Sequence, residues 1–543
     1  MSAPATALGA RFAARARLPN KWLITVSVSF GTLMGAIDAS IVNVALPHIQ
    51  GSLGASVQEV TWVSTGYAIA LVLLMPLTAF LGRMFGQKRV YMVCLALFLV
   101  GSALCGTATS LAQLVAYRAL QGMGAGALQP TEQAILRQTW PHAQQAMAMA
   151  VFGMVVMLGP AIGPTLGGTI VDHLHWSWIF FINLPVGAIG LFMVGAFVEE
   201  DETIRSQNKA LAARERRHVD FAGIALLSVS LSTLEYFLEE GDRNAWFEST
   251  AISVCGFVSL VSMIAFVARE LTAQAPVVNL RLLRDPAFAS GTLIGGLMFA
   301  MLMANMFLLP LFMQALLGFT ATQAGVSLAP RALVMIVVAP LVGRLYNLVS
   351  PRLLVAVGII AFALGSYQLS DLTLGSGEWN VVVGILVQGV GFGFLFVPLT
   401  TAALGNVPLR AMADATGLNS VVRQVGGAVG LAIFVTLLER YTSQARVALV
   451  AHVGATRPVA QQALANLEKA IQKSGVITAP DAHRAALRAM DASVQAQATV
   501  LAYDRVFLLG GIVFLFVLPL LYFLRTGRSE RSQQVEVHTE AHP

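Results

Sequence analysis

Two ionisable residues, Asp38 and Arg118, stand inside long apolar stretches of the sequence. A charge within a bilayer is costly, so a charged side chain at that depth usually marks a pathway for a substrate, an ion or a proton. With a helical rise of about 1.5 Å per residue, Asp38 lies roughly 12 Å from the outer end of the first predicted span, and Arg118 roughly 9 Å from the outer end of the fourth. We therefore expect them to meet, as a proton-titrating carboxylate and an arginine that favours its ionised form. A static buried ion pair is the alternative.

Other polar residues also fall in apolar runs, where they are candidates to line a substrate cavity. These are Asn43, Gln121, Gln314, Gln388 and Arg423. Arg423 has no obvious acidic partner, so it either faces the cavity or binds backbone carbonyl groups. Glu132 and Glu235 lie near the ends of their predicted spans. We expect these two carboxylates to reach the membrane interface by extension of the side chain.

The segment from Met154 to Ile170 combines an apolar membrane sequence with residues that disturb helices. Three of its glycines recur every four residues, so they form a bare face that another helix can approach closely. Two prolines each remove a backbone hydrogen bond and bend the axis, which is tolerable in lipid only against protein or a cavity. We interpret the segment as a hinge-like seam between two halves of the molecule, with a static packing seam as the alternative. Its glycines and prolines are Gly159, Pro160, Gly163, Pro164, Gly167 and Gly168.

The composition is that of a membrane protein with many spans. Of the 543 residues, 56% are hydrophobic and only 11% are charged, and the mean hydropathy is +0.72. Soluble globular domains do not have such values. Fourteen apolar runs are long enough to cross a bilayer, so we predict an all-α polytopic membrane protein. The runs fall near 22–47, 60–81, 90–108, 111–135, 147–170, 177–198, 219–238, 249–268, 287–313, 323–345, 352–370, 380–403, 414–438 and 503–524.

The sequence shows no signature of catalysis, of a metal site or of a bound cofactor. The three cysteines, Cys94, Cys105 and Cys255, lie in apolar runs without disulfide or metal spacing. The run Asp172-His173-Leu174-His175 is a short turn without further ligands, so we predict no metal there. No Walker A motif or nucleotide-binding strand–turn–helix unit is present, and no nucleophile–base pair emerges. We expect neither an enzyme nor an ATPase.

Lysine and arginine are concentrated in alternate loops. The short loops at 51–59, 171–176, 314–322 and 371–379 carry neither residue, whereas the loops on the other side carry several each. Because cytoplasmic loops are enriched in Lys and Arg, both termini are predicted to be cytoplasmic. The net charge of +6 therefore reflects topology in a lipid bilayer, and a nucleic-acid partner is not expected. The basic N-terminal segment and the first span are predicted to form an uncleaved signal anchor.

One outward segment, 440–500, is too long to be a simple turn. It is rich in Ala, Gln and Arg, and two of its stretches lack Pro and Gly. We predict two helices outside the membrane, joined around Gly475 and Pro480. They form either a solvated hairpin or a docking surface for a partner.

An internal repeat divides the chain. The run Gln121-Gly122-Met123-Gly124-Ala125-Gly126 returns 267 residues later as Gln388-Gly389-Val390-Gly391-Phe392-Gly393. Two parallel repeats of six helices are the architecture of a rocking transporter whose substrate site lies between the halves. We predict a cytoplasmic tail at 1–21, an N-terminal six-helix bundle at 22–200, and a cytoplasmic linker with two extra helices at 201–270. A C-terminal six-helix bundle at 271–524, which includes 440–500, and a cytoplasmic tail at 525–543 follow.

These motifs resemble the major facilitator superfamily, specifically its fourteen-helix drug:proton antiporters of the EmrB/QacA type, over nearly the whole chain. Asp38-Ala-Ser-Ile-Val-Asn-Val-Ala-Leu-Pro47 resembles the first-helix motif of that family, and Arg118-Ala-Leu-Gln121-Gly122 its fourth-helix motif. The resemblance implies that Asp38 and Arg118 act in proton coupling and that the Gly159–Gly168 stretch is the antiporter motif. It also implies energy from the proton gradient rather than a cofactor. Trp178-Ile-Phe-Phe-Ile-Asn183-Leu-Pro185 and Arg423-Gln424 fit the same subfamily.

The sequence departs from the family in the loop between the second and third helices, where a gating motif is expected. Its residues here are Gly82, Arg83, Gly86, Lys88 and Arg89. Arg83 stands where the family usually has an acid, so the usual charge relay of that loop is in question. Relatives in Gram-negative bacteria commonly work with a periplasmic adaptor, an EmrA-like membrane fusion protein, and an outer-membrane channel. The 440–500 segment is the expected adaptor contact.

We therefore predict a proton-coupled multidrug exporter of small amphipathic or lipophilic compounds in the bacterial inner membrane, working by alternating access. A dedicated exporter of one metabolite, fatty acid or siderophore is an alternative within the same class. An importer or a non-transporting membrane receptor is an alternative from a different class.

Overall fold

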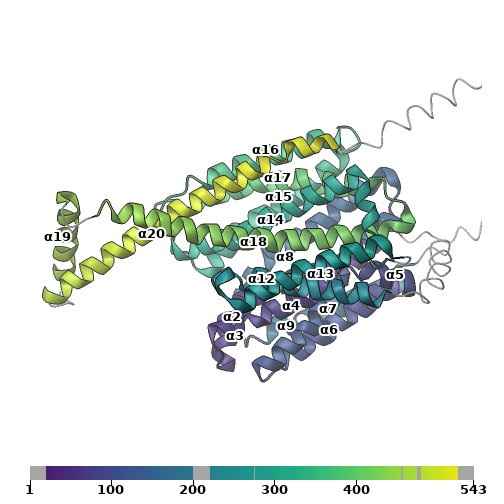
Figure 1. The fold of residues 1–543 in the computed structure, drawn as a ribbon, viewed down its shortest axis with the longest axis horizontal. Helices are drawn as coiled ribbons and strands as arrows, with labels where there is room; N and C mark the ends of the chain where they lie inside the picture. The colour runs from purple at the N-terminus through teal and green to yellow at the C-terminus, as the bar shows by residue number, and fades with distance from the viewer. Residues whose placement is uncertain (1–19, 200–219, 274–275, 454–456, 474–478, 524–543) are drawn as a thin grey trace, which may run out of the picture.

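The computed structural model describes residues 20–199, 220–273, 276–453, 457–473 and 479–523. These residues form α-helices and short 3-10 turns, and no strand occurs among them. Figure 1 shows a body of closely packed, roughly parallel helices, with a helical projection at one end. The predicted all-α class is confirmed.

The first part of the chain forms one group of helices whose main pairs are α2 with α8, α6 with α7 and α4 with α7. α4 and α5 form one bent element, with an angle of 53° at the break. Pro76 lies in this break and has no N–H to donate, which explains the bend. The helices are α2 (Lys21–Leu53), α3 (Val57–Val60), α4 (Trp62–Leu74), α5 (Thr78–Phe85), α6 (Gln87–Gly106), α7 (Leu111–Thr139), α8 (Gln145–His173), α9 (Trp178–Phe181) and α10 (Asn183–Phe197).

Two further helices, α12 (Phe221–Glu240) and α13 (Thr250–Thr272), pack on each other, and α12 also contacts α4 and α18. Asp220, just before α12, accepts a hydrogen bond from Arg269 Nε at 2.9 Å and another from the Gly223 amide at 2.9 Å. The bond from Arg269 lowers the pKa of Asp220, so this aspartate stays ionised near neutral pH. The ion pair joins one end of the two inserted helices.

The last part of the chain forms a second group with the same internal packing. Its main pairs are α14 with α18, α16 with α17 and α15 with α17, which correspond in order to the three pairs of the first group. The predicted repeat is therefore visible in the packing. The helices are α14 (Pro286–Ala315), α15 (Ala321–Leu345), α16 (Pro351–Leu369), α17 (Glu378–Gly405), α18 (Met412–Val450), α19 (Pro458–Lys473) and α20 (Ala479–Leu515).

Glycines explain why the repeated Gln-Gly sequences coincide with the repeated packing. A Cβ atom on Gly101 of α6 would lie 2.7 Å from the backbone nitrogen of Gln121 on α7. A Cβ atom on Gly365 of α16 would lie 2.7 Å from the backbone nitrogen of Gln388 on α17. Real Cβ atoms do not come so close, so each crossing requires glycine. Small residues at such crossings let membrane helices associate through their backbones.

The number of membrane spans differs by one or two from the predicted fourteen. Twelve of the described helices are long and apolar enough to cross a bilayer, or thirteen if the bent α4–α5 pair counts as one span. The remaining predicted span is α7, which has 29 residues but is too polar for that criterion. Its polar side chains Arg118, Gln121, Glu132, Gln133 and Arg137 are buried in protein. Protein contacts therefore replace lipid around much of this helix.

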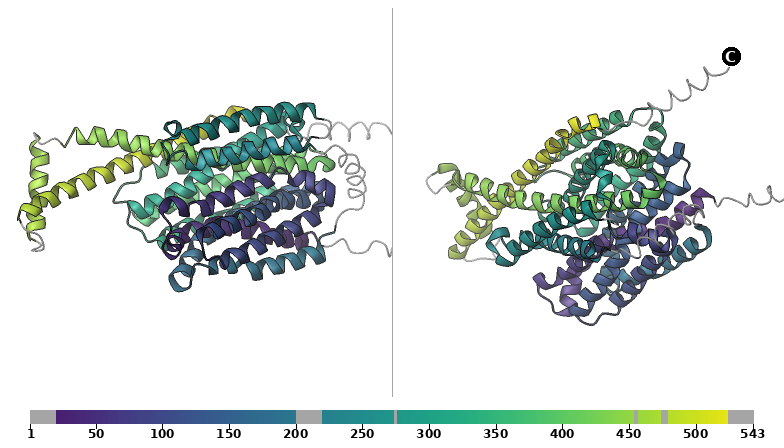
Figure 2. Two further views of the ribbon diagram at one scale, coloured as in Figure 1. Left: turned by 60° about the horizontal axis from the view of Figure 1, so that its bottom comes forward. Right: turned by 45° about the vertical axis from the view of Figure 1, so that its right-hand side comes forward.

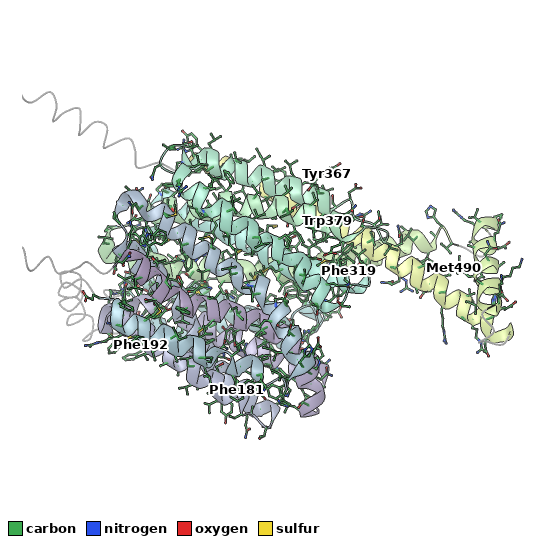
Figure 3. The ribbon with its side chains drawn as sticks, turned by 180° about the vertical axis from the view of Figure 1, so that it is seen from behind. Phe181, Phe192, Phe319, Tyr367, Trp379 and Met490 are labelled. Atoms are coloured by element: carbon green, nitrogen blue, oxygen red, sulfur yellow. The ribbon has the colours of Figure 1, made fainter. Side chains whose placement is uncertain are left out.

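The surface of the helix body is apolar, as a bilayer requires. Phe192 on α10 and Tyr367 on α16 are 72% and 64% exposed, and Figure 3 shows them on the body of the molecule. Met490 lies on the projection, away from the body. Lipid-facing positions in spans are expected to be apolar, so the body is the membrane-embedded part.

The 440–500 segment is helical, but it is not a separate hairpin. α18 continues through it to Val450, and α20 begins at Ala479 and runs on into the last span. α19 connects these two extensions and packs on α20, far from the body (Figures 1 and 2). The two predicted helices correspond to α19 and the outer part of α20, so the prediction of helices in this segment is confirmed, while the predicted junction at Gly475 lies outside the described residues. Long Ala-rich stretches without Pro or Gly let the membrane helices extend outward.

The glycine face of α8 packs on α2, within the first group of helices. Cβ atoms on Gly159, Gly163 and Gly167 would lie 2.3, 1.8 and 2.8 Å from atoms of Ala36, Ser40 and Ile41. The prediction that these glycines form a seam between the two halves is therefore wrong. The inference failed because spacing shows that a close neighbour exists but does not say which helix it is.

A different face of α8 does meet the other half. α8 packs along α15, and Thr165 lies near Gly325 of that helix. A Cβ atom on Gly168 would be 3.7 Å from Thr322. α8 runs as one helix through Pro160 and Pro164 and so connects α2 with α15. It is the element through which the two halves touch most extensively.

Replacing Gly159 by alanine tests the α2–α8 seam, because the new methyl would overlap the Cβ atom of Ala36 and its backbone. We expect Gly159→Ala to destabilise the protein by about 1–3 kcal/mol, as overpacking usually does. The matched control is Gly35→Ala on α2, where a Cβ atom would meet nothing within 4 Å. Thermal unfolding of the two purified variants in detergent measures the difference. Equal unfolding temperatures would contradict the close α2–α8 contact.

Candidate functional site

Asp38 and Arg118 form a buried ion pair, as their depths predicted. Arg118 Nη1 donates to Asp38 Oδ2 at 2.5 Å. The side chain of Asp38 is completely buried, and that of Arg118 is 1% exposed. A carboxylate at this depth is tolerated because it has a charged partner and further hydrogen bonds.

Three other groups complete the surroundings of Asp38. Gln121 Nε2 donates to Asp38 Oδ1 at 2.8 Å, and Asn183 Nδ2 donates to the same oxygen at 3.1 Å. Arg118 also donates to Gln121 Oε1 at 2.7 Å and, through Nε, to the carbonyl of Val63 at 3.1 Å. We call Asp38, Arg118, Gln121 and Asn183 the carboxylate cluster. Asp38 of α2 accepts from α7 and α10, and the bond of Arg118 to the Val63 carbonyl adds α4.

Local sequence explains the geometry of the cluster. Arg118 and Gln121 are three residues apart on α7, so both side chains project from one face. The guanidinium of Arg118 lies 4.0 Å from the centre of the Tyr67 ring, which adds a cation–π contact. Asn183 had not been predicted as a site residue, although the motif that contains it had been noted. The amide side chain of Asn183 within an otherwise apolar run is the feature of the sequence that could have identified it.

Two of the predicted cavity residues, Asn43 and Gln314, are exposed and belong to no buried polar group. Asn43 is exposed, and its side-chain oxygen accepts from Ser64 Oγ at 3.2 Å. Gln314 is exposed near the end of α14. A polar residue in an apolar run was too weak a signal to distinguish a cavity from a helix end.

Gln388 belongs to a second buried polar group, in the C-terminal half. Gln388 Nε2 donates to Ser366 Oγ at 3.0 Å and to Asn305 Oδ1 at 3.4 Å, and Gln388 Oε1 accepts from Arg331 at 3.2 Å. We call Arg331, Gln388, Asn305 and Ser366 the amide cluster. Asn305 and Gln388 occupy the positions of Asp38 and Gln121 in the repeat, 267 residues later. Arg331 and Asn305 had not been predicted, because the sequence alone did not place α15 beside α17.

Arg423 is buried among aromatic rings and not among carbonyl groups. Its guanidinium carbon lies 5.0 Å from the ring centre of Phe299, 5.6 Å from that of Phe396 and 6.0 Å from that of Phe152. Its one hydrogen bond within the described residues goes to Ser420 Oγ at 3.5 Å. Such cation–π contacts contribute about 0.5–2 kcal/mol each, less than the several kcal/mol that burying an unpaired cation costs. Phe152 belongs to the N-terminal half, so Arg423 lies where the halves meet.

The expected gating loop contains an ion pair between the halves. Arg83 of α5 donates to Asp414 in the first turn of α18, and both residues are buried. The arginine that replaces the usual acid therefore has a partner, and the start of α18 favours a negative side chain. Gly86 adopts φ of 90°, which glycine alone adopts readily, between α5 and α6. Lys88 donates to the Gly195 carbonyl at 2.8 Å, whereas Arg89 is exposed.

Glu132 and Glu235 were predicted to reach the membrane interface, and this prediction is wrong. Glu132 is completely buried and accepts from Ser29 Oγ at 2.9 Å. Glu235 on α12 is 2% exposed. Position within a span could not reveal that neighbouring helices enclose both carboxylates.

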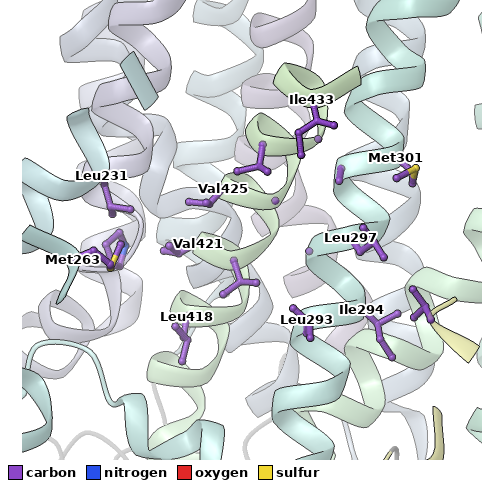
Figure 4. Close-up of a pocket in the computed structure, with 18 of the residues that line it drawn as sticks. Leu231, Met263, Leu293, Ile294, Leu297, Met301, Leu418, Val421, Val425 and Ile433 are labelled. Carbon is purple, nitrogen blue, oxygen red and sulfur yellow. The ribbon is translucent and has the colours of Figure 1, made fainter. Parts of the chain in front are cut away.

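An apolar cavity of about 780 Å³ lies apart from these polar groups (Figure 4). It is lined by side chains of α12, α13, α14, α18 and α20, among them Leu231, Met263, Leu297, Val421 and Val425. None of the predicted cavity residues lines it. Its lining offers no polar group that could orient a substrate.

Residues 28–431 match the family model described as Major Facilitator Superfamily. The fatty acid resistance protein FarB of Neisseria gonorrhoeae is 32% identical over 92% of this chain and 96% of that protein. The multidrug export protein EmrB of Haemophilus influenzae is 34% identical over 81% of this chain and 84% of that protein. The multidrug export protein EmrB of Escherichia coli K12 is 30% identical over 93% of this chain and 95% of that protein.

Solved structures support the same fold. The human organic anion transporter MFSD10 superposes with a TM-score of 0.59 at 16% identity, covering 91% of this chain and all of that one. The proton:xylose symporter XylE gives a TM-score of 0.59 at 11% identity, covering 91% of this chain and 95% of that one. The resemblance to transporters that the motifs predicted is therefore confirmed. The chain is a multi-pass membrane protein that belongs to the Major Facilitator Superfamily.

Proposed function

We propose that this protein is a proton-coupled multidrug exporter that moves small amphipathic or lipophilic compounds out of the cell by alternating access. The carboxylate cluster carries this proposal: a fully buried aspartate at membrane depth that joins α2 to α7 and α10. The relatives named as multidrug export proteins support export of varied compounds. The relative named for fatty acid resistance supports the narrower alternative of a dedicated fatty acid exporter.

Asp38 is the group that would bind and release the proton. In its ionised form it accepts from Arg118, Gln121 and Asn183. Protonation would remove the negative charge that holds Arg118, leaving Gln121 and the Val63 carbonyl as its acceptors. One proton would therefore change the contacts between α2, α7 and α10.

The position of Asp38 on α2 provides a route from the proton to the other half. Ala36 and Ser40, one on each side of Asp38, contact Gly159 and Gly163 of α8. The Ser40 hydroxyl also donates to the Gly159 carbonyl at 3.2 Å. Because α8 also packs along α15, a shift of α2 would be transmitted to the C-terminal half through α8.

The Arg83–Asp414 pair would hold the cytoplasmic side closed. It joins α5 of one half to α18 of the other, and both side chains are largely withdrawn from solvent. With both termini in the cytoplasm, as the loop charges indicate, this pair lies on the cytoplasmic side. Opening to the cytoplasm would require the pair to separate.

The projection formed by α19 and the outer ends of α18 and α20 would receive a periplasmic adaptor. α19 stands apart from the helix body (Figure 2), and none of its described residues is buried. An EmrA-like adaptor bound there would connect the exporter to an outer-membrane channel. Helical surfaces commonly bind helical partners through such exposed faces.

Asp38→Asn tests proton coupling. The amide is neutral at every pH and cannot exchange a proton, so we expect proton-driven transport in inside-out vesicles to fall at least tenfold, about the effect of losing a charged buried partner. Exchange of substrate for substrate, which needs no net proton movement, should persist. The matched control is Glu248→Gln, on an exposed turn. Proton-driven transport by Asp38→Asn at the rate of the unchanged protein would refute this role.

Charge reversal tests the closure between α5 and α18. Asp414→Arg should lower the transport rate about tenfold, because it leaves like charges buried together. The double variant Arg83→Asp with Asp414→Arg restores opposite charges and should recover much of the rate. Additive losses in the double variant would show that the two residues do not act as a pair.

Removal of the residues Pro458–Lys473 tests the adaptor surface. Transport in isolated vesicles should be unchanged, because the helix lies outside the membrane body. In intact cells that contain the adaptor and the outer-membrane channel, drug resistance should be lost. Full resistance without α19 would contradict its role in docking.

A further inference from the structure

Two buried arginines of the C-terminal half, Arg331 and Arg423, have no carboxylate partner. Arg331 is 2% exposed and Arg423 is 3% exposed. No ion pair joins either of them to an acid within the described part of the chain. The Nε and Nη1 atoms of both guanidinium groups make no hydrogen bond there. A buried charge that lacks a counter-ion marks a site where a charged ligand can supply it.

The internal repeat shows what is missing beside Arg331. In the N-terminal half, Gln121 Nε2 donates to a carboxylate oxygen of Asp38 at 2.8 Å. In the C-terminal half, Gln388 Nε2 donates to the amide oxygen of Asn305 at 3.4 Å. The repeat thus keeps the glutamine and replaces the acid by an uncharged amide, while Ile385 stands at the position of Arg118 and Arg331 of α15 supplies the arginine instead. The negative charge that the carboxylate cluster carries is absent from the amide cluster.

The surroundings of Arg423 suit an apolar ligand with a negative end. Phe299 and Phe396 come from the C-terminal half, and Phe152 comes from α8 of the N-terminal half. Their rings form apolar walls beside a fixed positive charge. Movement of one half against the other would open this site, since the rings belong to both halves. A cationic ligand would be repelled by the guanidinium.

The two arginines lie beside one strip of α17. Arg331 is 5.8 Å from the ring centre of Phe392, and Arg423 is 5.6 Å from that of Phe396. Positions four residues apart lie one turn apart on the same helix face. An anionic group moving along this face would therefore meet both charges in turn.

We propose that Arg423, together with Arg331, binds the carboxylate of amphipathic organic acids, whose apolar body lies against Phe152, Phe299 and Phe396. The inference rests on the proposed export function and defines one substrate class for it. In the structure described, the arginines are enclosed, so the ligand enters when the halves separate. Arg118 cannot serve in the same way, because Asp38 already neutralises it.

A matched series of fluorescent probes tests the charge requirement. 1-Pyrenebutyrate, 1-pyrenebutanol and 1-pyrenebutylamine share one aromatic body and carry a negative, a neutral and a positive end. Binding to the purified full-length protein in detergent is measured by fluorescence anisotropy. We expect the acid to bind about tenfold or more tightly than the alcohol and the amine, as a charge-assisted contact provides. Equal affinities for the acid and the amine would overturn the proposal.

Four substitutions locate the site. Arg423→Gln should remove the preference for the acid while binding of the alcohol stays unchanged, and Arg423→Lys should keep most of the preference. Asn419→Asp and Asn305→Asp give the arginines an internal counter-ion with almost no change in shape, since Asn419 lies one turn from Arg423 on α18. Each should weaken acid binding selectively, which decides the question even if Arg423→Gln fails to fold. Undiminished preference for the acid in both aspartate variants would refute the assignment.

Proton-driven transport of 1-pyrenebutyrate separates this proposal from the export function. Asp38→Asn should retain the preference for the acid in binding and lose proton-driven transport. If the protein shows no preference for the acid but transports other compounds in an Asp38-dependent way, the proposed acid site is refuted and the proposed export function stands. If the protein prefers the acid in binding but shows no proton-driven transport of any compound, the acid site stands and the proposed export function is refuted.

Discussion

The cost of holding charge at membrane depth governs the interior of this protein. Asp38 and Arg118 are buried together, and that cost is reduced by the hydrogen bonds that Gln121 and Asn183 donate to Asp38 and by the one that Arg118 donates to the Val63 carbonyl. These contacts join α2, α4, α7 and α10, so the ion pair of Asp38 with Arg118 holds four helices in register, and it depends on the charge of Asp38. A change in that charge therefore cannot remain local. Such a group is well placed to convert proton binding into movement.

The two halves share helix packing but differ in their charge. The amide cluster keeps two positions of the carboxylate cluster, with Asn305 in place of Asp38 and Gln388 in place of Gln121, whereas its arginine, Arg331, comes from α15. One cluster thus contains a carboxylate with its own counter-ion, whereas Arg331 and Arg423 of the other half have no acidic partner among the described residues. In the proposed mechanism, this asymmetry would assign proton binding to the N-terminal half and substrate binding to the C-terminal half. Close helix crossings at Gly101 and Gly365 give the two halves the same helix packing, although their buried polar groups differ.

The sequence predicted the helical class, the internal repeat and the meeting of Asp38 with Arg118, because hydropathy and depth along a helix are local quantities. It did not predict which helix faces a glycine stripe, so the partner of Gly159 was misplaced. It also missed Arg331, Asn305 and the Arg83–Asp414 pair. Each of these depends on contacts between distant segments, which one sequence without the fold does not specify. Similarly, Glu132 lies in a polar helix whose burial is decided by its neighbours.

Substrate-induced proton release tests the coupling role of Asp38 most directly. In an antiporter, substrate and proton favour opposite states of the carboxylate, and linkage makes the effect reciprocal. Addition of a transported compound to the purified protein in weakly buffered detergent should release about one proton per molecule from the unchanged protein, and none from Asp38→Asn. Equal proton release by both proteins would contradict the assignment of Asp38 as the coupling carboxylate.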